Sequence, residues 1–480
     1  MVGASAIRAG ILAQSTSTLE GGGPVWGGEF PIYKVKNQRI FQAGSWVVVG
    51  HLLSQLIRLG GNLILTRILA PEMFGVMVIV NIFVMGVQML SDLGLGQSVI
   101  QNKRGDDPVF VNTAWTLQII RGVVIWLLIC ILAWLLWLVS ESGLLDSDQV
   151  YAHPLLPWLL VIVGASSAIA GFNSMAIFQA NRELIFGRLT LINLTAQIAG
   201  LFVIIVIAWL YETIWALAVG VLVSSFVDML LSHKFLPGIK NQIHWDRTAL
   251  TELIRFGKWI FVSSAVGFIA NQGDRLILGG LLSAQVLGIY GIAFMLSNLP
   301  ASIVSQLSHK VLFPNFSSIN REHPDNLRSS LIKSKLWLSA LVMPLTGMLM
   351  GLSQYIIDFL YDARYSEAGW MMELLLLRVA TGCLLIPNVL VMMAKGLPQY
   401  STVSALLKAI FLFFALPVSF NIYGTKEMVL MVGLSGLVSI PVLWFALLRH
   451  RLFSIRIEIF SVLLLLAGYM ISILILQIME

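Results

Sequence analysis

The chain has 480 residues, a hydrophobic fraction of 58%, a charged fraction of 11% and a mean hydropathy of +0.87. Water-soluble globular proteins carry about 25% charged residues, so the composition excludes a soluble globule and indicates a polytopic membrane protein. The net charge of +6 would suggest nucleic-acid binding in a soluble protein. Here the basic residues follow the predicted membrane topology, and we expect no nucleic-acid partner.

Thirteen segments are long and apolar enough to cross a bilayer as helices, which takes about 20 residues each. We therefore expect an all-α polytopic membrane protein with about 13 transmembrane helices. The range is 12 to 14, because a hidden hairpin or a last segment that does not span would change the total. The predicted spans are 44–66, 74–98, 111–139, 155–178, 188–210, 213–232, 257–282, 286–308, 335–357, 369–394, 399–421, 428–448 and 457–478.

Basic residues between these spans gather on one side of the membrane. With the amino terminus inside, the outer side keeps only Arg67, Arg364 and Lys426 as basic residues, among many acids. This asymmetry is the positive-inside rule, and it predicts a cytoplasmic amino terminus.

Residues 1–40 contain Gly21, Gly22 and Gly23 but no pattern of a secretory signal. We interpret them as a flexible cytoplasmic tail. The remaining predicted units are an N-terminal six-helix lobe at 41–235, a cytoplasmic linker at 236–251, a C-terminal six-helix lobe at 252–450 and an additional transmembrane helix at 451–480.

The first and seventh spans are copies of each other, offset by 213 residues. Gly44 and Trp46 match Gly257 and Trp259, Gly60 matches Gly273, the run 63–65 matches 276–278, and Gly75 matches Gly288. Six helices separate the two copies, so both cross the membrane in the same direction. The sequence therefore predicts two parallel repeats around a central cavity, a pattern typical of transporters.

Polar residues recur every three or four positions along both copies, which places each set on one face of a helix. His51, Ser54, Arg58 and Asn62 align with Ser264, Gly267, Asn271 and Arg275. We expect Asn62 and Asn271 to line the cavity. The alternative is two related helices that pack against each other without a transport role.

Five basic residues remain inside the spans: Arg58, Arg121, Arg275, Arg378 and Lys408. Each would cost about 2.5 to 3.5 kcal/mol at a helix centre facing lipid. They are therefore expected to face water, an acid or a ligand. Guanidinium groups grip phosphate with two parallel hydrogen bonds, so we interpret all five as candidate ligands of an anionic headgroup; the alternatives are structural pairing and snorkelling.

Acids that could pair with these bases are Asp92, Asp228, Asp274 and Glu373. Asp274 adjoins Arg275, and Glu373 lies five residues from Arg378. Structural pairing with these neighbours would account for Arg275 and Arg378. We expect Asp92, Asp274 and Glu373 to take part in the cavity or in ion coupling.

Motifs for other chemistry are missing from the sequence. It contains no Walker loop GxxxxGK[ST], no HExxH and no GxSxG after a strand. Cys130 and Cys383 both lie inside apolar spans and imply no disulfide framework or metal site. We expect no cofactor and no enzymatic activity.

Four strings resemble the polysaccharide transport family of Wzx-type flippases. They are LTRILAPEMFGVMVIV at 65–80, SDLGLGQSVIQ at 91–101, ANQGDRLILGGLLSAQVLGIYGIA at 270–293 and HKVLFPNFSSI at 309–319. The resemblance covers about residues 38–450 and carries over most directly to Asp92, Asp274 and Arg275.

This resemblance implies the fold of the multidrug/oligosaccharidyl-lipid/polysaccharide exporter superfamily, with two lobes around a cavity that opens to alternate sides. It also implies flipping of undecaprenyl-pyrophosphate-linked oligosaccharides to the outer leaflet of the bacterial inner membrane, during synthesis of O-antigen lipopolysaccharide, capsule or exopolysaccharide. Expected partners are the lipid-linked oligosaccharide, membrane lipids, and a glycan polymerase with its export machinery. The rivals are a cation-coupled multidrug exporter, a peptidoglycan-precursor flippase and a membrane-embedded glycan polymerase.

Overall fold

The computed structural model describes the backbone of residues 31–479 apart from 92, 93, 103, 144 and 147. Side chains are described from Ser45 to Ile478, outside those positions and 255–263, 265–267, 270, 271, 303, 309 and 310. Over this part of the chain all regular structure is helical, apart from one antiparallel bridge between Gln149 and Ser283. The expected all-α fold is confirmed.

The N-terminal lobe contains eight α-helices among its described residues. They are α1 (Pro31–Ile68), α2 (Pro71–Leu90), α3 (Leu95–Gln101), α4 (Pro108–Glu141), α5 (Leu156–Gly171), α6 (Ala176–Arg182), α7 (Phe186–Tyr211) and α8 (Trp215–Phe235). Helix α1 thus begins ten residues before the predicted lobe boundary at 41, and residues 1–30 of the predicted tail lie outside the described residues.

The C-terminal half follows the same plan and adds a final helix. Its helices are α9 (Arg247–Gly279), α10 (Ala284–Leu307), α11 (Phe313–Glu322), α12 (Leu327–Gly351), α13 (Ser353–Leu360), α14 (Ala368–Ala394), α15 (Gln399–Tyr423), α16 (Thr425–Leu434), α17 (Ile440–Arg449) and α18 (Ile455–Met479). Helices α2 and α10 begin 213 residues apart, as the repeat predicts.

Ten helical segments in the described residues are long and apolar enough to cross a membrane, and two bent pairs raise the number to 12. The pairs are α5 with α6, bent by 64°, and α12 with α13, bent by 66°. Each of these 12 overlaps one of the 13 predicted spans, although α2 ends at Leu90, eight residues before the predicted end of the span 74–98. The remaining prediction, 257–282, falls on α9, whose side chains are described only in part. The total of 13 therefore stays a prediction.

Apolar side chains cover the outside of the bundle as well as its interior. Phe202 and Trp209 on α7 are 66% and 73% exposed, and Phe413 and Phe414 on α15 are 61% and 64% exposed. A soluble monomer rarely exposes apolar surface on this scale. Contact with lipid tails explains it, and the chain is a multi-pass membrane protein.

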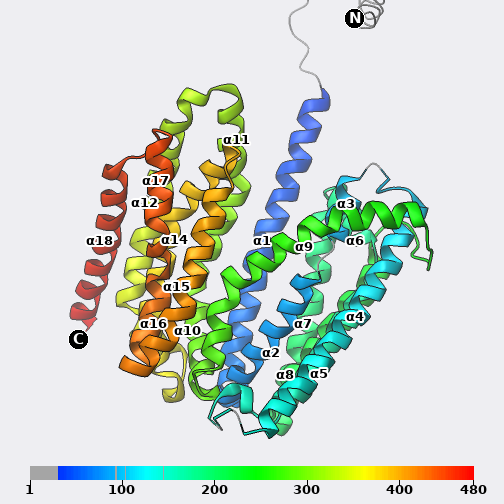
Figure 1. Cartoon of the computed structure of the whole chain (residues 1–480), viewed down its shortest axis with the longest axis horizontal. Coiled ribbons are helices and arrows are strands. Elements are labelled where there is room, and N and C mark those ends of the chain that lie inside the picture. Colours follow the sequence, from blue (N-terminus) through cyan, green and yellow to red (C-terminus); the bar gives the residue numbers. More distant parts are fainter. Residues whose placement is uncertain (1–30, 92–93, 103, 144, 147, 480) are drawn as a thin grey trace, which may run out of the picture.

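Figure 1 shows two groups of helices, with α4, α5, α7 and α8 on one side and α12, α14, α15 and α18 on the other. Helices α1 and α9 run between the groups, and α2 packs along α10. The two groups approach each other near the start of α10 and diverge toward α3, α6 and α11. We call the first end the acidic end, because its loops hold Asp146 and Asp362 and the short helix α13 holds Asp358, and we call the other end the basic end.

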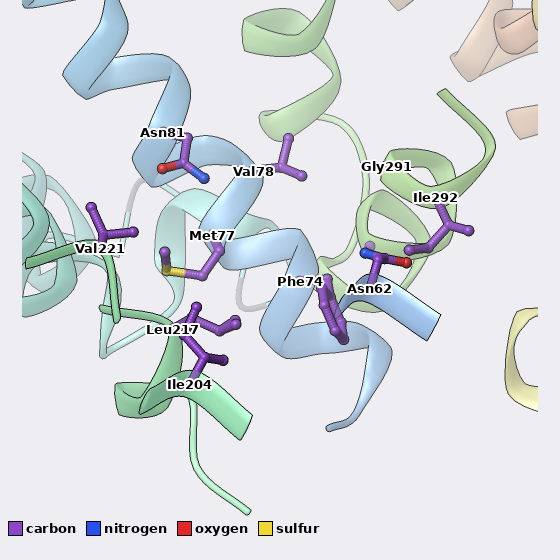
Figure 2. Close-up of a pocket in the computed structure, with 11 residues that line it drawn as sticks. Asn62, Phe74, Met77, Val78, Asn81, Ile204, Leu217, Val221, Gly291 and Ile292 are labelled. Atoms are coloured by element: carbon purple, nitrogen blue, oxygen red, sulfur yellow. The ribbon is translucent and has the colours of Figure 1, made fainter. Parts of the chain in front are cut away.

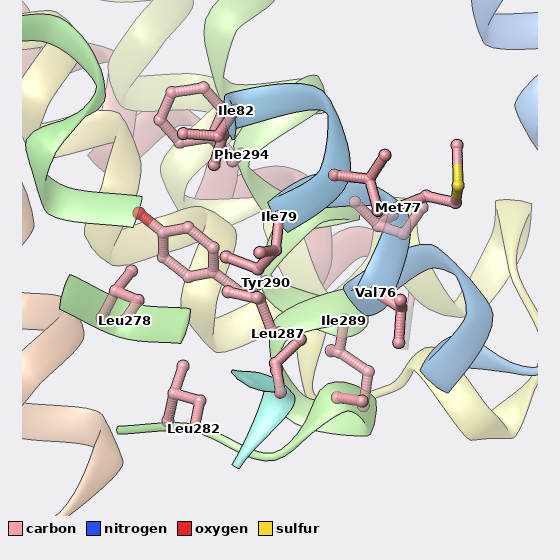
Figure 3. Packing of buried hydrophobic residues seen from close by; sticks show 14 of the residues in the cluster. Val76, Met77, Ile79, Ile82, Leu278, Leu282, Leu287, Ile289, Tyr290 and Phe294 are labelled. Atoms are coloured by element: carbon pink, nitrogen blue, oxygen red, sulfur yellow. The ribbon is translucent and has the colours of Figure 1, made fainter. Parts of the chain in front are cut away.

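A continuous apolar core joins the two lobes at the acidic end. It contains Val76, Ile79 and Ile82 of α2, packed with Leu287 and Tyr290 of α10 (Figure 3). Ser283 caps the first turn of α10 through a hydrogen bond from the Val286 backbone N–H. The polar lining described below lies between this core and the basic end.

Helix α18, the predicted additional helix, packs closely against α12. Buried Lys335 on α12 forms an ion pair with buried Glu458 on α18 and donates a second hydrogen bond, 3.2 Å long, to Asn388 Oδ1 on α14. Ser461 on α18 donates to Ser339 on α12 at 2.7 Å. A buried charge must be paired to be tolerated, so these contacts fix where α18 docks.

Candidate anion-binding cavity between the lobes

The polar stripe of α1 lines three cavities in succession. His51 and Ser54 border a cavity of about 390 Å³ within the N-terminal lobe, which we call the N-lobe cavity. Arg58 borders a central cavity of about 480 Å³ between the lobes. Asn62 borders a third, of about 230 Å³, which we call the Asn62 cavity. The three or four residue spacing read from the sequence therefore does place these side chains along one polar path.

The central cavity is formed by α1, α2, α9 and α10. Its polar lining consists of Gln55, Arg58, Arg275, Asn298, Ser302 and Ser305. Two arginines from the repeat-related helices α1 and α9 thus share one cavity. No carboxylate lies among its described lining residues. A cavity of this size fits the usual range for small ligands, and its charge suits an anion.

Arg275 is held in place by an aromatic ring. Its guanidinium carbon lies 4.0 Å from the centre of the Phe294 ring, and the guanidinium carbon of Arg378 on α14 lies 5.1 Å from the same centre. Stacking on an aromatic face stabilises a guanidinium without neutralising it. The positive charge therefore remains available to a ligand in the cavity.

A second layer of charge lies behind Phe294. Buried Asp274, 4% exposed, accepts a hydrogen bond and ion pair of 3.2 Å from Arg378. Lys408 on α15 is close enough to interact electrostatically with both Arg378 and Asp274. Arg378 thus pairs with this carboxylate, and Arg275 and Lys408 both interact with it electrostatically.

The Arg378–Asp274 pair corrects the expected pairing. Adjacent residues on a helix point in different directions, and residues five apart do not face each other. Among the described residues, the ion pair of Asp274 is with Arg378, and none joins Arg275 to Asp274 or Arg378 to Glu373. Glu373 instead accepts a hydrogen bond of 3.4 Å from the Tyr469 hydroxyl on α18. That contact places Glu373 at the docking surface of α18.

The other candidates lie apart from this cluster. Arg121 donates to the Gln88 carbonyl oxygen on α2 at 3.0 Å, and the Gln88 amide donates to Ser167 at 2.9 Å. Arg121 thus contacts the interior of the N-terminal lobe. Asp92 and the side chain of Asn271 lie outside the described residues.

Sequence reasoning missed several residues of the site. Asn298, Ser302 and Ser305 form a polar stripe on α10 with spacings of four and three residues, and this periodicity would have revealed them. Phe294 carries no such signal, because an aromatic residue on an apolar helix is usually a packing residue.

Contacts across the lobes close the acidic end beyond the cavity. Arg364 is paired with Asp362 and donates to the Thr66 carbonyl oxygen at the end of α1, at 2.8 Å. The Tyr361 hydroxyl donates to Asn62 Oδ1 at 3.2 Å. The Arg364–Asp362 pair holds the pKa of Asp362 below its usual range, chiefly through the side-chain hydrogen bond. The carboxylate therefore stays ionised near neutral pH.

The Asn62 cavity is lined by Asn62, by Phe74, Met77 and Val78 of α2, and by Leu217 and Val221 of α8 (Figure 2). The polar path along α1 thus ends in a mostly apolar cavity directly behind the closing contacts.

The two repeated helical lobes, with a polar cavity between them, match solved structures over most of their length. These structures include "Lipid II flippase MurJ, inward closed conformation", with a TM-score of 0.66, 15% identity and coverage of 90% of this chain and 92% of that one. They also include a multidrug resistance MATE family transporter of the MOP superfamily in an inward-facing conformation, with a TM-score of 0.62, 13% identity and coverage of 84% and 94%. The chain therefore shares the fold of these solved structures.

Residues 64–369, more than half of the chain, match the family described as polysaccharide biosynthesis protein. The chain belongs to this family. The predicted resemblance to the polysaccharide transport family of Wzx-type proteins is confirmed. The lipopolysaccharide biosynthesis protein WzxC of Escherichia coli is 22% identical over 70% of this chain and 66% of its own length. The teichuronic acid biosynthesis protein TuaB of Bacillus subtilis is 20% identical over 64% and 62%. The chain thus spans slightly less than two thirds of these relatives.

Proposed function

We propose that the protein is a flippase that moves undecaprenyl-pyrophosphate-linked oligosaccharide repeat units from the cytoplasmic to the outer leaflet by alternating access. It would serve the synthesis of O-antigen lipopolysaccharide, capsule or exopolysaccharide. The observation that carries the proposal is the central cavity, which joins Arg58 and Arg275 and has no carboxylate among its described lining residues.

A pyrophosphate is the chemical group that fits this lining best. Each guanidinium offers a planar fork of donors that matches two phosphate oxygens. Arg58 and Arg275 would grip the diphosphate, while Arg378 and Lys408 would add attraction from behind Phe294. The amide of Asn298 and the hydroxyl of Ser302 would complete the hydrogen bonds. The remaining candidate, Arg121, would act within the N-terminal lobe.

Alternating access would work by rocking the two lobes about the cavity. In this conformation the acidic end is closed by the joint apolar core and by the contacts of Tyr361 and Arg364. The positive-inside rule supports a cytoplasmic basic end, with the amino terminus inside and the protein in the bacterial inner membrane. The substrate would then enter between the lobes from the cytoplasmic leaflet and leave after the acidic end opens.

The membership of the WzxC and TuaB relatives in polysaccharide pathways supports this substrate class. A transporter role in place of an enzymatic one agrees with the fold. A glycan polymerase and export machinery would act downstream as partners. The multidrug exporter remains the rival of the same fold, and it predicts a cavity dominated by acids, unlike the described lining of the central cavity.

The test is transport in proteoliposomes. A fluorescent undecaprenyl-pyrophosphate oligosaccharide would be scored for protection from a quencher in the external medium, with wild type beside Arg58→Ala and Arg275→Ala. We expect translocation that requires the protein and is lost in both folded variants. Transport of organic cations without any lipid translocation would instead favour the multidrug exporter.

A further inference from the structure

The N-lobe cavity differs chemically from the central cavity. It lies between α1, α6, α7 and α8, and its polar lining includes His51, Ser54, Asn193, Gln197 and Asp228. No lysine or arginine occurs among its described lining residues. Two cavities along one helix therefore offer different surfaces, one cationic and one built from amides, two hydroxyls, an imidazole and a single carboxylate.

Two polar atoms beside the N-lobe cavity have no hydrogen-bond partner among the described residues. They are His51 Nε2 and Asp228 Oδ1, both buried. The other oxygen of Asp228 accepts from the Asn173 amide at 3.1 Å, which holds the carboxylate in place. A buried polar atom without a hydrogen-bond partner destabilises the structure. A ligand with several hydroxyl groups would remove this destabilisation after a small rotation of either side chain.

The frame of the cavity is fixed by contacts between α1 and α7. Ser54 donates to Gln197 Oε1 at 2.7 Å, and the Gln197 amide donates back to the Ser54 carbonyl oxygen at 3.0 Å. Gly50 allows the close approach of the two helices, since a Cβ there would lie 2.3 Å from Thr190 Cγ2. The cavity is thus part of the packed lobe, held open between its helices.

We propose that the N-lobe cavity is a glycan subsite that holds neutral sugar rings of the lipid-linked substrate, next to the diphosphate in the central cavity. This inference rests on the proposed function. Amide, carboxylate and imidazole side chains bind hydroxyl groups by donating and accepting hydrogen bonds. The single charge, on Asp228, disfavours acidic sugars.

Size and position agree with a sugar. The cavity of about 390 Å³ is more than tenfold larger than the ~30 Å³ that one water occupies, so a lone cation would leave most of it empty. His51 and Arg58 are seven residues apart on α1, which is about 10 Å along the helix axis. A phosphate and the sugar bonded to it span such a distance, and a substrate gripped at Arg58 can reach the N-lobe cavity without leaving α1.

The experiment compares two lipids that differ only in the glycan. Binding of undecaprenyl pyrophosphate without sugar and of the same lipid carrying a neutral disaccharide would be measured by native mass spectrometry on the full chain in nanodiscs. We expect wild type to bind the glycosylated lipid about tenfold more tightly, the ratio that one or two net hydrogen bonds supply. Asn193→Leu and Asp228→Asn should lose this preference and keep wild-type affinity for the sugarless lipid.

Thr195→Ala is the matched control. Thr195 lies on α7 like Asn193 but is not among the residues that line the N-lobe cavity, and its hydroxyl is bonded to the Leu191 carbonyl oxygen, so this variant should keep the preference. Arg58→Ala should weaken both lipids equally. Thermal unfolding would verify that each variant is folded. If one of Asn193→Leu and Asp228→Asn does not fold, the comparison is made with the other.

Three outcomes would overturn the inference. Cavity variants that weaken both lipids alike, or neither, would exclude a glycan subsite. Binding of the sugarless lipid that depends on sodium, with the dependence lost in Asp228→Asn, would assign the cavity to a cation. Folded wild type that binds neither lipid would refute the proposed function itself, and the subsite with it; the first two outcomes leave that function intact.

Discussion

Gly75 and Gly288 occupy equivalent positions of the two repeats and pack against each other across the lobe boundary. A Cβ on Gly75 would lie 1.8 Å from the Ala284 carbonyl oxygen, and a Cβ on Gly288 would lie 1.9 Å from the Pro71 carbonyl oxygen. Pro71 and Ala284 are themselves 213 residues apart. The contact is therefore reciprocal, as expected where two copies of one helix cross at a pseudo-twofold axis.

Replacing either glycine by alanine should push the lobes apart at the acidic end. The added methyl group meets backbone that cannot rotate away, and overpacking of this kind costs about 1–3 kcal/mol. Thermal unfolding of Gly75→Ala and Gly288→Ala should show similar losses. Access to the Asn62 cavity would be measured with Asn81→Cys in a protein whose Cys130 and Cys383 have been replaced. This cysteine should react faster with an impermeant maleimide in the Gly75→Ala or Gly288→Ala variant than in the protein with both glycines.

Gly60→Ala is the control for this prediction, because a Cβ at Gly60 would meet nothing within 4 Å. It should leave stability unchanged or raise it by about 0.5–1 kcal/mol, since alanine favours helix over glycine. Equal behaviour of all three variants would show that the crossing of α2 and α10 does not depend on the glycines.

Much of the architecture was predictable because it depends on local composition. A run of apolar residues at a membrane-spanning length gives a helix whatever its neighbours are, so the predicted spans fall on helices. The repeat was also visible in residues such as Gly75 and Gly288. Their mutual contact was not, because a sequence offset gives the equivalence of two helices but not the surface through which they pack.

Part of the candidate site was also predictable from local sequence, because its residues recur at helical spacing. Arg58 and Arg275 lie on polar stripes, and the structure brings both to the central cavity. The partner of Arg378 could not be read from the sequence, since Asp274 is 104 residues away and meets it only after α9 and α14 are placed. The two cation–aromatic contacts of Phe294 depend on packing in the same way.

Removing Arg378 should destabilise the protein more than removing Arg58. Arg378→Met leaves Asp274 buried without its partner, whereas Arg58 is exposed to the central cavity. Breaking a buried pair costs about 3–5 kcal/mol; here we expect roughly 1–3 kcal/mol, because Arg275 and Lys408 remain nearby. Unfolding by heat in detergent would measure the difference. If Arg58→Met were equally destabilising, the Arg378–Asp274 pair would not be a main structural contact.

The ion pair that docks α18 should show strong coupling between its two residues. Lys335→Met or Glu458→Met alone strands a buried charge, which should cost about 3–5 kcal/mol. The double variant removes both charges and should recover most of that loss. A double-mutant cycle on thermal unfolding would give the coupling energy, and purely additive losses would argue against the pair.

Acid should weaken the contact that closes the acidic end only well below neutral pH. The hydrogen bond from Arg364 lowers the pKa of Asp362 in the folded protein. A depressed carboxyl pKa adds stability that is fully present above the unfolded value, about 3.9, and is lost as pH falls through the folded value. The difference in unfolding temperature between wild type and Asp362→Asn should therefore be constant from about pH 5 to 8 and shrink below about pH 4. A difference that already declines between pH 7 and 6 would show that another group, such as a histidine, controls this end of the protein.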